Sequence, residues 1–327
     1  MYLSSRIKLS ISVFAFIFLI LSSIQLKIKN PIILAERFFT YTGWFEVFIV
    51  SLYGSIVAFN MYDRNKVAVW RKYTWIIFSF LFFMQLILGL LGIEKCLMTG
   101  KLHLPIPLMI LSGPIYRGHL SFMTFLFLST ILLVGPAWCS HLCYFGALDN
   151  YMASKKKLAK SLNKNTIIQF KFSVLFIIIA VTLILKYFNL ETYIALSLAI
   201  LFGLFGIVLI LFISRKKGKM IHCIAYCPIG TIVSVIKYIN PIRLQINNKC
   251  NLCMHCSGVC NYNALTKENL TKGKPALTCT LCGDCLNSCN KNYISYKLFN
   301  INNEYARNIY LFLSVSLHSV FLALARI

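Results

Sequence analysis

Six long stretches with almost no charged residue constrain the fold of this chain more than any other feature. Each is about 20 residues long, the length at which a helix crosses the hydrocarbon core of a bilayer. The 327 residues are 58% hydrophobic and only 13% charged, a composition that ordinary soluble domains do not have. We therefore predict an all-α transmembrane bundle. The stretches are roughly Ile7–Leu26, Trp44–Met61, Tyr73–Ile93, His119–Trp138, Phe170–Phe188 and Thr192–Ile213.

A seventh apolar stretch lies near the C-terminus, at Ile309–Ala325. It is weaker than the others because Ser314, Ser316, His318 and Ser319 interrupt it. A helix with this mixture of residues either crosses the membrane or lies in its interface. The bundle is therefore expected to contain six or seven helices.

The distribution of positive charge predicts how the chain is oriented. The net charge is +24, from 33 Lys and Arg against 9 Asp and Glu. When the six stretches are threaded through a membrane, the basic runs at 64–72, 155–171 and 215–219 fall on the side of the N-terminus. Basic residues concentrate in the cytoplasmic loops of membrane proteins. We therefore expect a multi-pass protein of the cytoplasmic (inner) membrane, and the charge gives no reason to expect a nucleic acid partner.

Eight of the 13 cysteines form two copies of one spacing, C-x2-C-x2-C-x3-C. Three thiolates at this spacing can bind three corners of a 4Fe-4S cube, and in two-cluster ferredoxins the fourth ligand comes from the other run. A zinc ribbon or a disulfide framework fits runs of four cysteines less well. We predict a first cluster held by Cys250, Cys253, Cys256 and Cys289, and a second held by Cys279, Cys282, Cys285 and Cys260. The module that carries them follows the sixth stretch and is therefore expected on the cytoplasmic side.

Four further cysteines form a second constellation, in two matching frames. Cys139 and Cys143 lie in WCSHLCYFG, and Cys223 and Cys227 lie in HCIAYCPIG. On a helix, residues four apart share one face, and the predicted threading places both pairs at the same side of the membrane. The four thiols could bind a third iron-sulfur centre, copper or another soft metal, or form a dithiol couple. His141 and His222 could act as ligands or proton relays, and the alternative is that small cysteines merely pack helix ends.

The loop before the fourth stretch is too apolar for solvent and is broken by several prolines and glycines. Such backbone is tolerated at membrane depth only where protein shields it or where it lines a cavity. Tyr116, Arg117 and His119 offer hydrogen-bonding groups beside apolar walls, and His103 lies earlier in the loop. These residues could hold the headgroup of a membrane quinol. A re-entrant segment that only packs the bundle is the alternative.

These motifs together resemble a known family, the NapH-type membrane polyferredoxins, which are quinol dehydrogenase components associated with periplasmic nitrate reductase. Membrane halves of nitrous-oxide-reduction regulators and ferredoxin-containing oxidase maturation proteins are similar. The resemblance rests on the two C-x3-C frames, the GPIYRG sequence at 113–118 and the two cysteine runs. It implies electron transfer between quinol and partner redox proteins through two 4Fe-4S clusters. The chain departs from the family pattern at Tyr144, where the second frame has Pro228, and at Asn261 and Asn290, where ferredoxins usually have proline.

The sequence thus predicts a membrane-bound electron-transfer subunit, part of an oxidoreductase complex, that relays electrons between the quinone pool and a partner reductase. The alternative is a metal-handling assembly factor that reduces copper or another soft ion for a metalloenzyme. No dinucleotide-binding glycine fingerprint and no C-x-x-C-H haem motif occurs, so donors and acceptors must lie on other redox subunits, such as a ferredoxin-like protein, a cytochrome or a reductase. We expect a transmembrane domain at 1–239, an α+β two-cluster ferredoxin-like domain at 240–299 and a C-terminal helix at 300–327.

Overall fold

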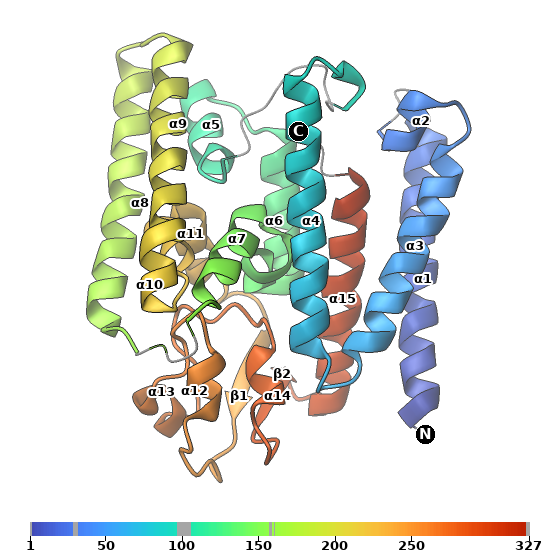
Figure 1. The fold of residues 1–327 in the computed structure, drawn as a ribbon, viewed down its shortest axis with the longest axis vertical. Coiled ribbons are helices and arrows are strands. Elements are labelled where there is room, and N and C mark those ends of the chain that lie inside the picture. Colours follow the sequence, from blue (N-terminus) through green and yellow to red (C-terminus); the bar gives the residue numbers. More distant parts are fainter. Residues whose placement is uncertain (1, 29–31, 97–105, 157–158, 160, 325–327) are drawn as a thin grey trace. The chain divides into compact units, whose positions relative to one another are not determined.

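The computed structural model describes residues 2–28, 32–96, 106–156, 159 and 161–324, which are mainly helical (Figure 1). The chain divides into two compact units. The first comprises Met1–His103 and Asn300–Ile327, and the second comprises Leu104–Phe299.

The first unit, as far as it is described, consists of long helices with two short ones. These are α1 (Tyr2–Lys27), α2 (Leu34–Phe38), α3 (Gly43–Met61), α4 (Val67–Leu90), η1 (Glu94–Cys96) and α15 (Asn303–Leu324). Helix α3 packs against both α1 and α15. A Cβ added at Gly54 would lie 2.7 Å from the Oγ of Ser319 and closer still to Ile17, so the absence of a side chain lets the three helices approach closely.

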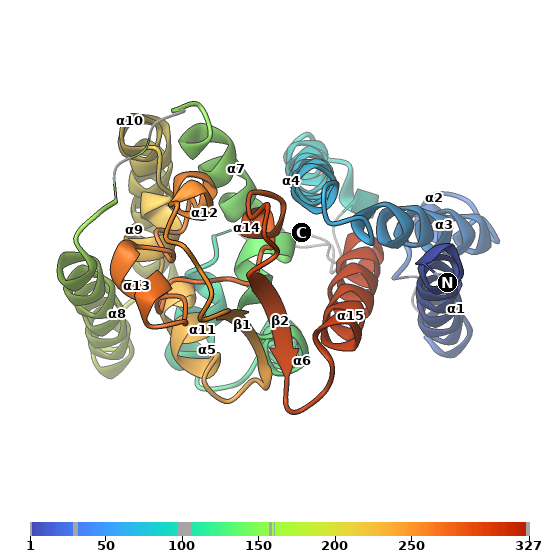
Figure 2. The same ribbon diagram turned by 90° about the horizontal axis from the view of Figure 1, so that it is seen from below.

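The second unit contains helices that surround the cysteine frames and a small module that follows them. The helical part has α5 (Met109–Arg117), α6 (Phe122–Val134), α7 (Tyr144–Ala153), α8 (Lys164–Tyr187), α9 (Thr192–Val208), α10 (Arg215–Lys217) and α11 (Pro228–Ile236). The module has β1 (Ile242–Ile246), α12 (His255–Val259), α13 (Lys267–Thr271), α14 (Asp284–Asn287) and β2 (Ile294–Leu298). It lies at the lower end of this unit in Figure 1 and faces the viewer in Figure 2.

The two C-x3-C frames repeat one local structure. Helix α6 continues through η2 (Gly135–Ala137) into the π-helix η3 (Trp138–Leu142), and α9 continues through the π-helix η4 (Leu209–Ser214) and α10 toward the π-helix η5 (His222–Tyr226). The backbone N–H of Cys143 bonds the carbonyl of Trp138 at 3.1 Å, and that of Cys227 bonds His222 at 2.8 Å. The pairs therefore sit on π-turns and not on the ordinary helix that the spacing alone predicts. Turns of this kind occur frequently at functional sites.

The small module is built on one antiparallel pair of strands. The register runs from Ile242 opposite Leu298 to Ile246 opposite Ile294. Alternate residues of both strands are buried, as expected when one face of a two-stranded sheet packs against a core. This module, with its short strands and helices, agrees with the predicted α+β fold.

Seven helices among the described residues are long and apolar enough to cross a membrane, which indicates a multi-pass membrane protein. Six correspond to the predicted stretches, and the helix 303–324 meets the same criterion of length and composition. They are Ser4–Lys27, Gly43–Met61, Val67–Leu90, Met123–Leu142, Lys164–Tyr187, Thr192–Lys217 and Asn303–Leu324.

Candidate iron-sulfur and thiolate sites

The structure groups the eight cysteines of the two runs around two separate voids. A cavity of about 220 Å³ is lined by the cysteines predicted to hold the first cluster: Cys250, Cys253, Cys256 and Cys289. A smaller void of about 20 Å³ is lined by those predicted to hold the second: Cys260, Cys279, Cys282 and Cys285. Each void thus takes three cysteines from one run and the fourth from the other.

Exposure differs between the two groups. In the first, Cys253 is exposed and only Cys256 is buried. In the second, Cys260 and Cys285 are buried, and the Sγ of Cys260 accepts a hydrogen bond of 3.3 Å from the backbone N–H of Ala264. The first site therefore faces solvent and the second lies inside the unit.

These cysteines fit a cluster better than a single ion. Within the described part of the chain, no three His, Cys, Asp or Glu side chains converge closely enough to hold one metal ion. A cube spreads its thiolate ligands over four iron corners, so they stand farther apart than ligands of one ion. Burial raises the pKa of Cys256 to about 11 and that of Cys285 well above its ordinary value, with repulsion from neighbouring cysteines adding to both. Iron must therefore displace protons when it binds.

The C-x3-C cysteines are also brought together inside the second unit. Cys139, Cys143 and Cys227 are buried, and Cys223 is partly buried. The sulfur of Cys223 interacts electrostatically with those of the other three. Burial raises the pKa of Cys223 far above its ordinary value, with repulsion from the Asp149 carboxylate as the next cause.

The second cysteine of each frame caps the helix that follows it. The backbone amides of Phe145 and Gly146 lower the pKa of Cys143, and those of Ile229 and Gly230 lower the pKa of Cys227. Burial and the charge of Cys227 raise the pKa of Cys143 to about 12, and the amides oppose that rise. Backbone N–H groups at a helix start stabilise a thiolate or an anionic cluster in the same way.

A steric constraint explains why glycine occupies position 230 in the second frame. A Cβ added at Gly230 would lie 2.7 Å from the carbonyl oxygen of Cys223. Real Cβ atoms do not approach backbone oxygen so closely, so a side chain here would push η5 away from α11. Gly230 therefore permits the close packing of η5 on α11 that sets the positions of Cys223 and Cys227.

Lys171 was not predicted to belong to this site. It lies on α8 and is only 2% exposed. Its Nζ donates a hydrogen bond of 2.7 Å to the Oγ of Ser234, and its charge interacts with Cys139, Cys227 and Cys223. The signal in the sequence was a lysine within the apolar stretch 170–188, which holds one other lysine, Lys186, since a charge within a span usually marks a functional site.

Asp149 is a second residue that sequence reasoning missed. It lies on α7 and is fully buried. Its Oδ2 accepts a hydrogen bond of 3.0 Å from the backbone N–H of Cys223. Asp149 therefore joins α7, which begins within the first frame, to the second frame. Burial raises its pKa to about 6, although hydrogen bonds from Ser214 and Cys223 oppose that rise. It is the single acid between residues 95 and 190, which could have drawn attention to it.

The two histidines beside the frames have different surroundings. The buried ring of His222 stacks on Phe145 with centroids 5.5 Å apart, and neither of its nitrogens has a hydrogen-bond partner among the described residues. Burial lowers the pKa of His222 to about 4, so the ring is neutral. His141 instead shares a hydrogen bond of 2.9 Å with the Oγ of Ser140.

Two hydrogen bonds connect the C-x3-C site to the second cysteine void. The hydroxyl of Tyr262 donates to the carbonyl of Cys139 at 3.1 Å, and the Oγ of Ser140 donates to the carbonyl of Thr280 at 3.0 Å. Tyr262 and Thr280 both line the void of Cys260 and Cys279–Cys285. The two sets of thiols are therefore immediate neighbours.

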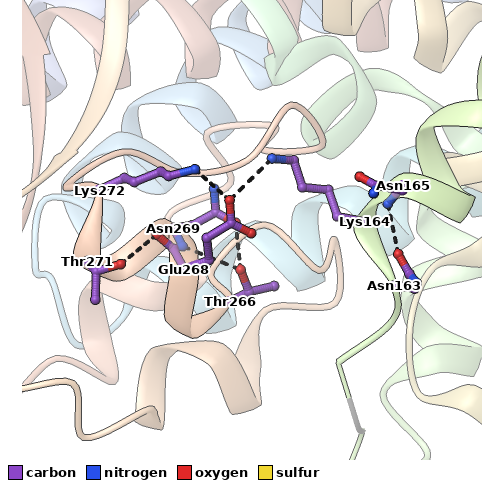
Figure 3. Close-up of polar contacts among 8 residues, drawn as sticks. All are labelled: Asn163, Lys164, Asn165, Thr266, Glu268, Asn269, Thr271 and Lys272. Atoms are coloured by element: carbon purple, nitrogen blue, oxygen red, sulfur yellow. Dashed lines mark hydrogen bonds and ion pairs between the residues drawn. The ribbon is translucent and has the colours of Figure 1, made fainter.

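The module is also fastened to α8 by polar contacts (Figure 3). Lys164 at the start of α8 and Lys272 after α13 both point toward Glu268, with N–O distances of 3.7 and 2.6 Å. All of these side chains are well exposed, so each ion pair contributes at most about 1 kcal/mol. Of the two pairs, Lys164–Glu268 joins the module to α8, whereas Lys272 and Glu268 both belong to the module.

A cavity of about 350 Å³ lies between α5, α8 and α9. Its walls are mostly apolar, and Tyr116, Arg117, Ser112 and Thr182 supply polar groups. The predicted quinol-site residues Tyr116 and Arg117 therefore line one cavity. His119 is exposed and does not line it, and His103 lies outside the described residues.

An aromatic pair joins this cavity to the C-x3-C site. Phe202 of α9 lines the cavity, and its ring stacks on Tyr226 with centroids 4.3 Å apart and planes 15° apart. The Tyr226 hydroxyl donates to the Phe202 carbonyl at 3.0 Å. Tyr226 directly precedes Cys227 and interacts electrostatically with it, so the two rings link the cavity to the C-x3-C site.

Comparison with known proteins gives one match. A protein-family model described as a 4Fe-4S binding domain matches residues 118–161 and 196–243, the segments that contain the two C-x3-C frames. No curated protein and no solved structure matched the chain. The match, together with the cysteine groups described above, supports an iron-sulfur protein of the ferredoxin type that transfers electrons.

Proposed function

We propose that this chain is a membrane-bound electron-transfer subunit that relays electrons between the quinone pool and a partner reductase. The observation that carries the proposal is a continuous series of contacts within the second unit. It runs from the cavity through Phe202 and Tyr226 to the C-x3-C thiols, and from there through Tyr262 to the second cysteine void. The solvent-facing first void, with exposed Cys253, ends the series.

The cavity between α5, α8 and α9 is the proposed quinol site. Its apolar walls suit a quinone ring and its isoprenoid tail, and the Arg117 guanidinium suits a ring oxygen. The Tyr116 hydroxyl donates to the Leu190 carbonyl at 2.6 Å, so its oxygen can accept a hydrogen bond from a quinol hydroxyl. Oxidation of a quinol releases two electrons and two protons, and reduction of a quinone takes them up. The series of contacts serves either direction.

The eight cysteines of the two runs would hold two 4Fe-4S clusters, which supply one-electron carriers when bound. The four C-x3-C cysteines would hold a third cluster. Two features support a cluster there: the match to a 4Fe-4S binding domain covers these frames, and helix-start amides point at two of the sulfurs. In this arrangement Lys171 offsets the negative charge of the thiolates.

We further propose that the protein lies in the cytoplasmic membrane with its cluster module in the cytoplasm, on the basis of the basic loops at 64–72, 155–171 and 215–219. Its partners would be membrane lipid and quinone, and a soluble or membrane-bound redox protein that meets the exposed first site. The NapH-type role implied by the sequence resemblance belongs to this proposal.

The alternative of a copper-reducing assembly factor is less well supported. A copper ion needs two to four donors around one point, and among the described residues no three His, Cys, Asp or Glu side chains are so arranged. The cavity with Tyr116 and Arg117 also has no role in that alternative.

The test is anaerobic EPR on purified, detergent-solubilised protein before and after a menaquinol analogue is added, with iron counted on the same sample. About twelve irons per chain are expected for three cubes and about eight for two. Quinol should make reduced-cluster signals appear. Clusters that respond only to a strong chemical reductant would contradict the quinol role.

The variants Cys139→Ser and Cys223→Ser should abolish electron flow and remove about four irons while the other clusters remain. Cys96→Ser is the matched control, because Cys96 is also buried but belongs to the first unit and to none of the cysteine groups. Full electron flow in both site variants would exclude a relay at the C-x3-C site.

A further inference from the structure

A second large cavity, of about 580 Å³, lies in the second unit, outside the proposed series of contacts from the quinol site. We call this cavity the groove. It is formed by the end of α6, the residues after α11, strand β1 and the loop at 272–275. All of its lining residues are described, and none is Asp or Glu. Its charged residues are all cations: Lys237, Arg243, Lys272, Lys274 and Lys297.

Two of these cations are fixed in place by neutral partners. The Nζ of Lys237 donates to the carbonyls of Ala276 and Leu277 at 2.9 and 2.7 Å. The guanidinium of Arg243 donates to the carbonyls of Lys237 and Tyr238. Carbonyl oxygens orient a cation but do not neutralise its charge. The groove therefore carries positive charge on ordered side chains.

The remaining three cations of the groove differ in whether they form an ion pair. Lys272 is paired with Glu268 at 2.6 Å, as Figure 3 shows, and so adds little. Lys274 and Lys297 are exposed and form no ion pair within the described residues. Four cations thus surround the groove without a carboxylate partner among the described residues, and one of them, Lys237, also interacts electrostatically with Cys279.

The position of the groove indicates the source of the anion. Pro136, which lines it, belongs to the candidate span Met123–Leu142, so the groove opens at the end of a span. Tyr238 at its rim and the adjacent Ile239 are 66% and 74% exposed. Both residues follow α11, which is not a candidate span, but the neighbouring Asn240 donates to the Leu132 carbonyl near the end of α6. Exposed aromatic residues beside a span end are typical of side chains that enter the membrane interface. These features favour a groove at the depth of lipid headgroups.

We propose that this groove binds the phosphate of an anionic phospholipid headgroup. Arg243 and Lys237 supply preoriented donors, and Lys274 and Lys297 add attraction for a net negative headgroup. Free phosphate shares this chemistry, but only the lipid explains the apolar rim at Tyr238. The proposal does not depend on the quinol role.

Occupancy of the groove would also affect electron transfer. Cys279, a proposed ligand of the second cluster, lines the same groove. A bound anion adds negative charge beside that cluster and disfavours its reduced form, which carries one more electron. The reduction potential of the second cluster should therefore be lower when an anionic lipid is bound.

The experiment measures lipid binding to the full-length protein with its clusters, delipidated in a neutral detergent, by native mass spectrometry. The probes are short-chain phosphatidylglycerol, phosphatidylcholine of the same chain length and inorganic phosphate. Phosphatidylglycerol should bind more tightly than the other two. In the double variant Lys274→Glu with Lys297→Glu its affinity should fall about thirtyfold or more, from the loss of two cations near a headgroup.

The matched control is Lys249→Glu with Lys267→Glu, which changes the net charge equally at two exposed lysines of the module that do not line the groove. The control should bind like wild type, and both double variants should keep wild-type iron content. Equal loss of affinity in the control, equal binding of phosphatidylcholine, or binding of inorganic phosphate as tight as that of the lipid would each overturn the proposal. None of these results bears on quinol reduction, so the two proposals fail separately.

Discussion

Lys171 is an ammonium group buried inside a candidate transmembrane helix, where its charge interacts with three cysteine sulfurs. Removing an ion from water costs several kcal/mol even after the protein relaxes. Its hydrogen-bond partner, the Ser234 hydroxyl at 2.7 Å, is neutral and does not offset that cost. The thiolates that a bound cluster would require would offset it, because they bring the opposite charge.

Lys171→Met should lower the reduction potential of the centre held by the C-x3-C cysteines. Loss of the cation disfavours the extra negative charge of the reduced form. We expect a decrease of roughly 60 mV or more, which is about 1.4 kcal/mol for a one-electron couple. Potentiometric titration followed by EPR measures it.

Lys186→Met is the control for this change, because Lys186 lies on the same helix but is exposed. It should leave the potential unchanged. Equal potentials in Lys171→Met and wild type, at equal iron content, would show that Lys171 does not act on the centre.

Residues of the site differed in how far sequence could predict them. The cysteines were found because their spacing is local and their ligand geometry requires it. Lys171 and Asp149 were missed because their hydrogen-bond partners are distant in the chain. Ser234 is 63 residues from Lys171, and Cys223 is 74 residues from Asp149. Only the fold brings such pairs together.

At the scale of elements, the π-turns η3 and η5 decide how each cysteine pair is presented. Each ends at a cysteine that caps the next helix, and helix-start amides point at that sulfur. The apolar stretches predicted the long helices well, because hydrophobic length is a local property. The π-turns were not predictable from residue spacing, since the same C-x3-C spacing fits an ordinary helix and tertiary packing selects between them.

Gly230→Ala tests the close packing of η5 on α11. The new Cβ would meet the Cys223 carbonyl at 2.7 Å, and because both atoms are on backbone, one element must shift. We expect the C-x3-C centre to be lost while the clusters of the small module remain, so the iron count falls by about four per chain.

Gly258→Ala is a matched control within another cysteine-rich segment. Nothing lies within 4 Å of a Cβ added at Gly258, which sits in α12 between Cys256 and Cys260. This variant should keep all of its iron and its thermal stability. Wild-type iron content in Gly230→Ala would contradict the steric role assigned to that glycine.

At the scale of the whole molecule, the C-terminal helix α15 belongs with α1 and α3 in one unit, although more than 200 residues separate them in the chain. Sequence alone left this helix undecided between a span and an interfacial helix, because its serines and histidine weaken the apolar pattern. Several of these polar residues are buried in the unit, and the Nε2 of His318 lies 3.0 Å from the Tyr53 hydroxyl. Such pairing is a tertiary feature that hydropathy does not reveal.

The proposed electron path through the second unit can be tested at the Phe202–Tyr226 pair. Tyr226→Leu removes the ring that stands between the cavity and Cys227, whereas Tyr226→Phe keeps the ring and removes only the hydroxyl. We expect Tyr226→Leu to slow cluster reduction by a menaquinol analogue roughly tenfold, since small displacements of reacting groups already change rates by more than that. Tyr226→Phe should react like wild type.

Stopped-flow absorption of the clusters measures both rates, and dithionite supplies the internal comparison. Dithionite can reach the exposed first site at Cys253 without using the cavity. Its rate should therefore be the same in wild type and both variants, provided that all three hold equal iron. If Tyr226→Leu slowed dithionite as much as quinol, the ring would be needed for the integrity of the clusters. If it slowed neither, electrons would enter by a route that does not pass between the cavity and the C-x3-C thiols.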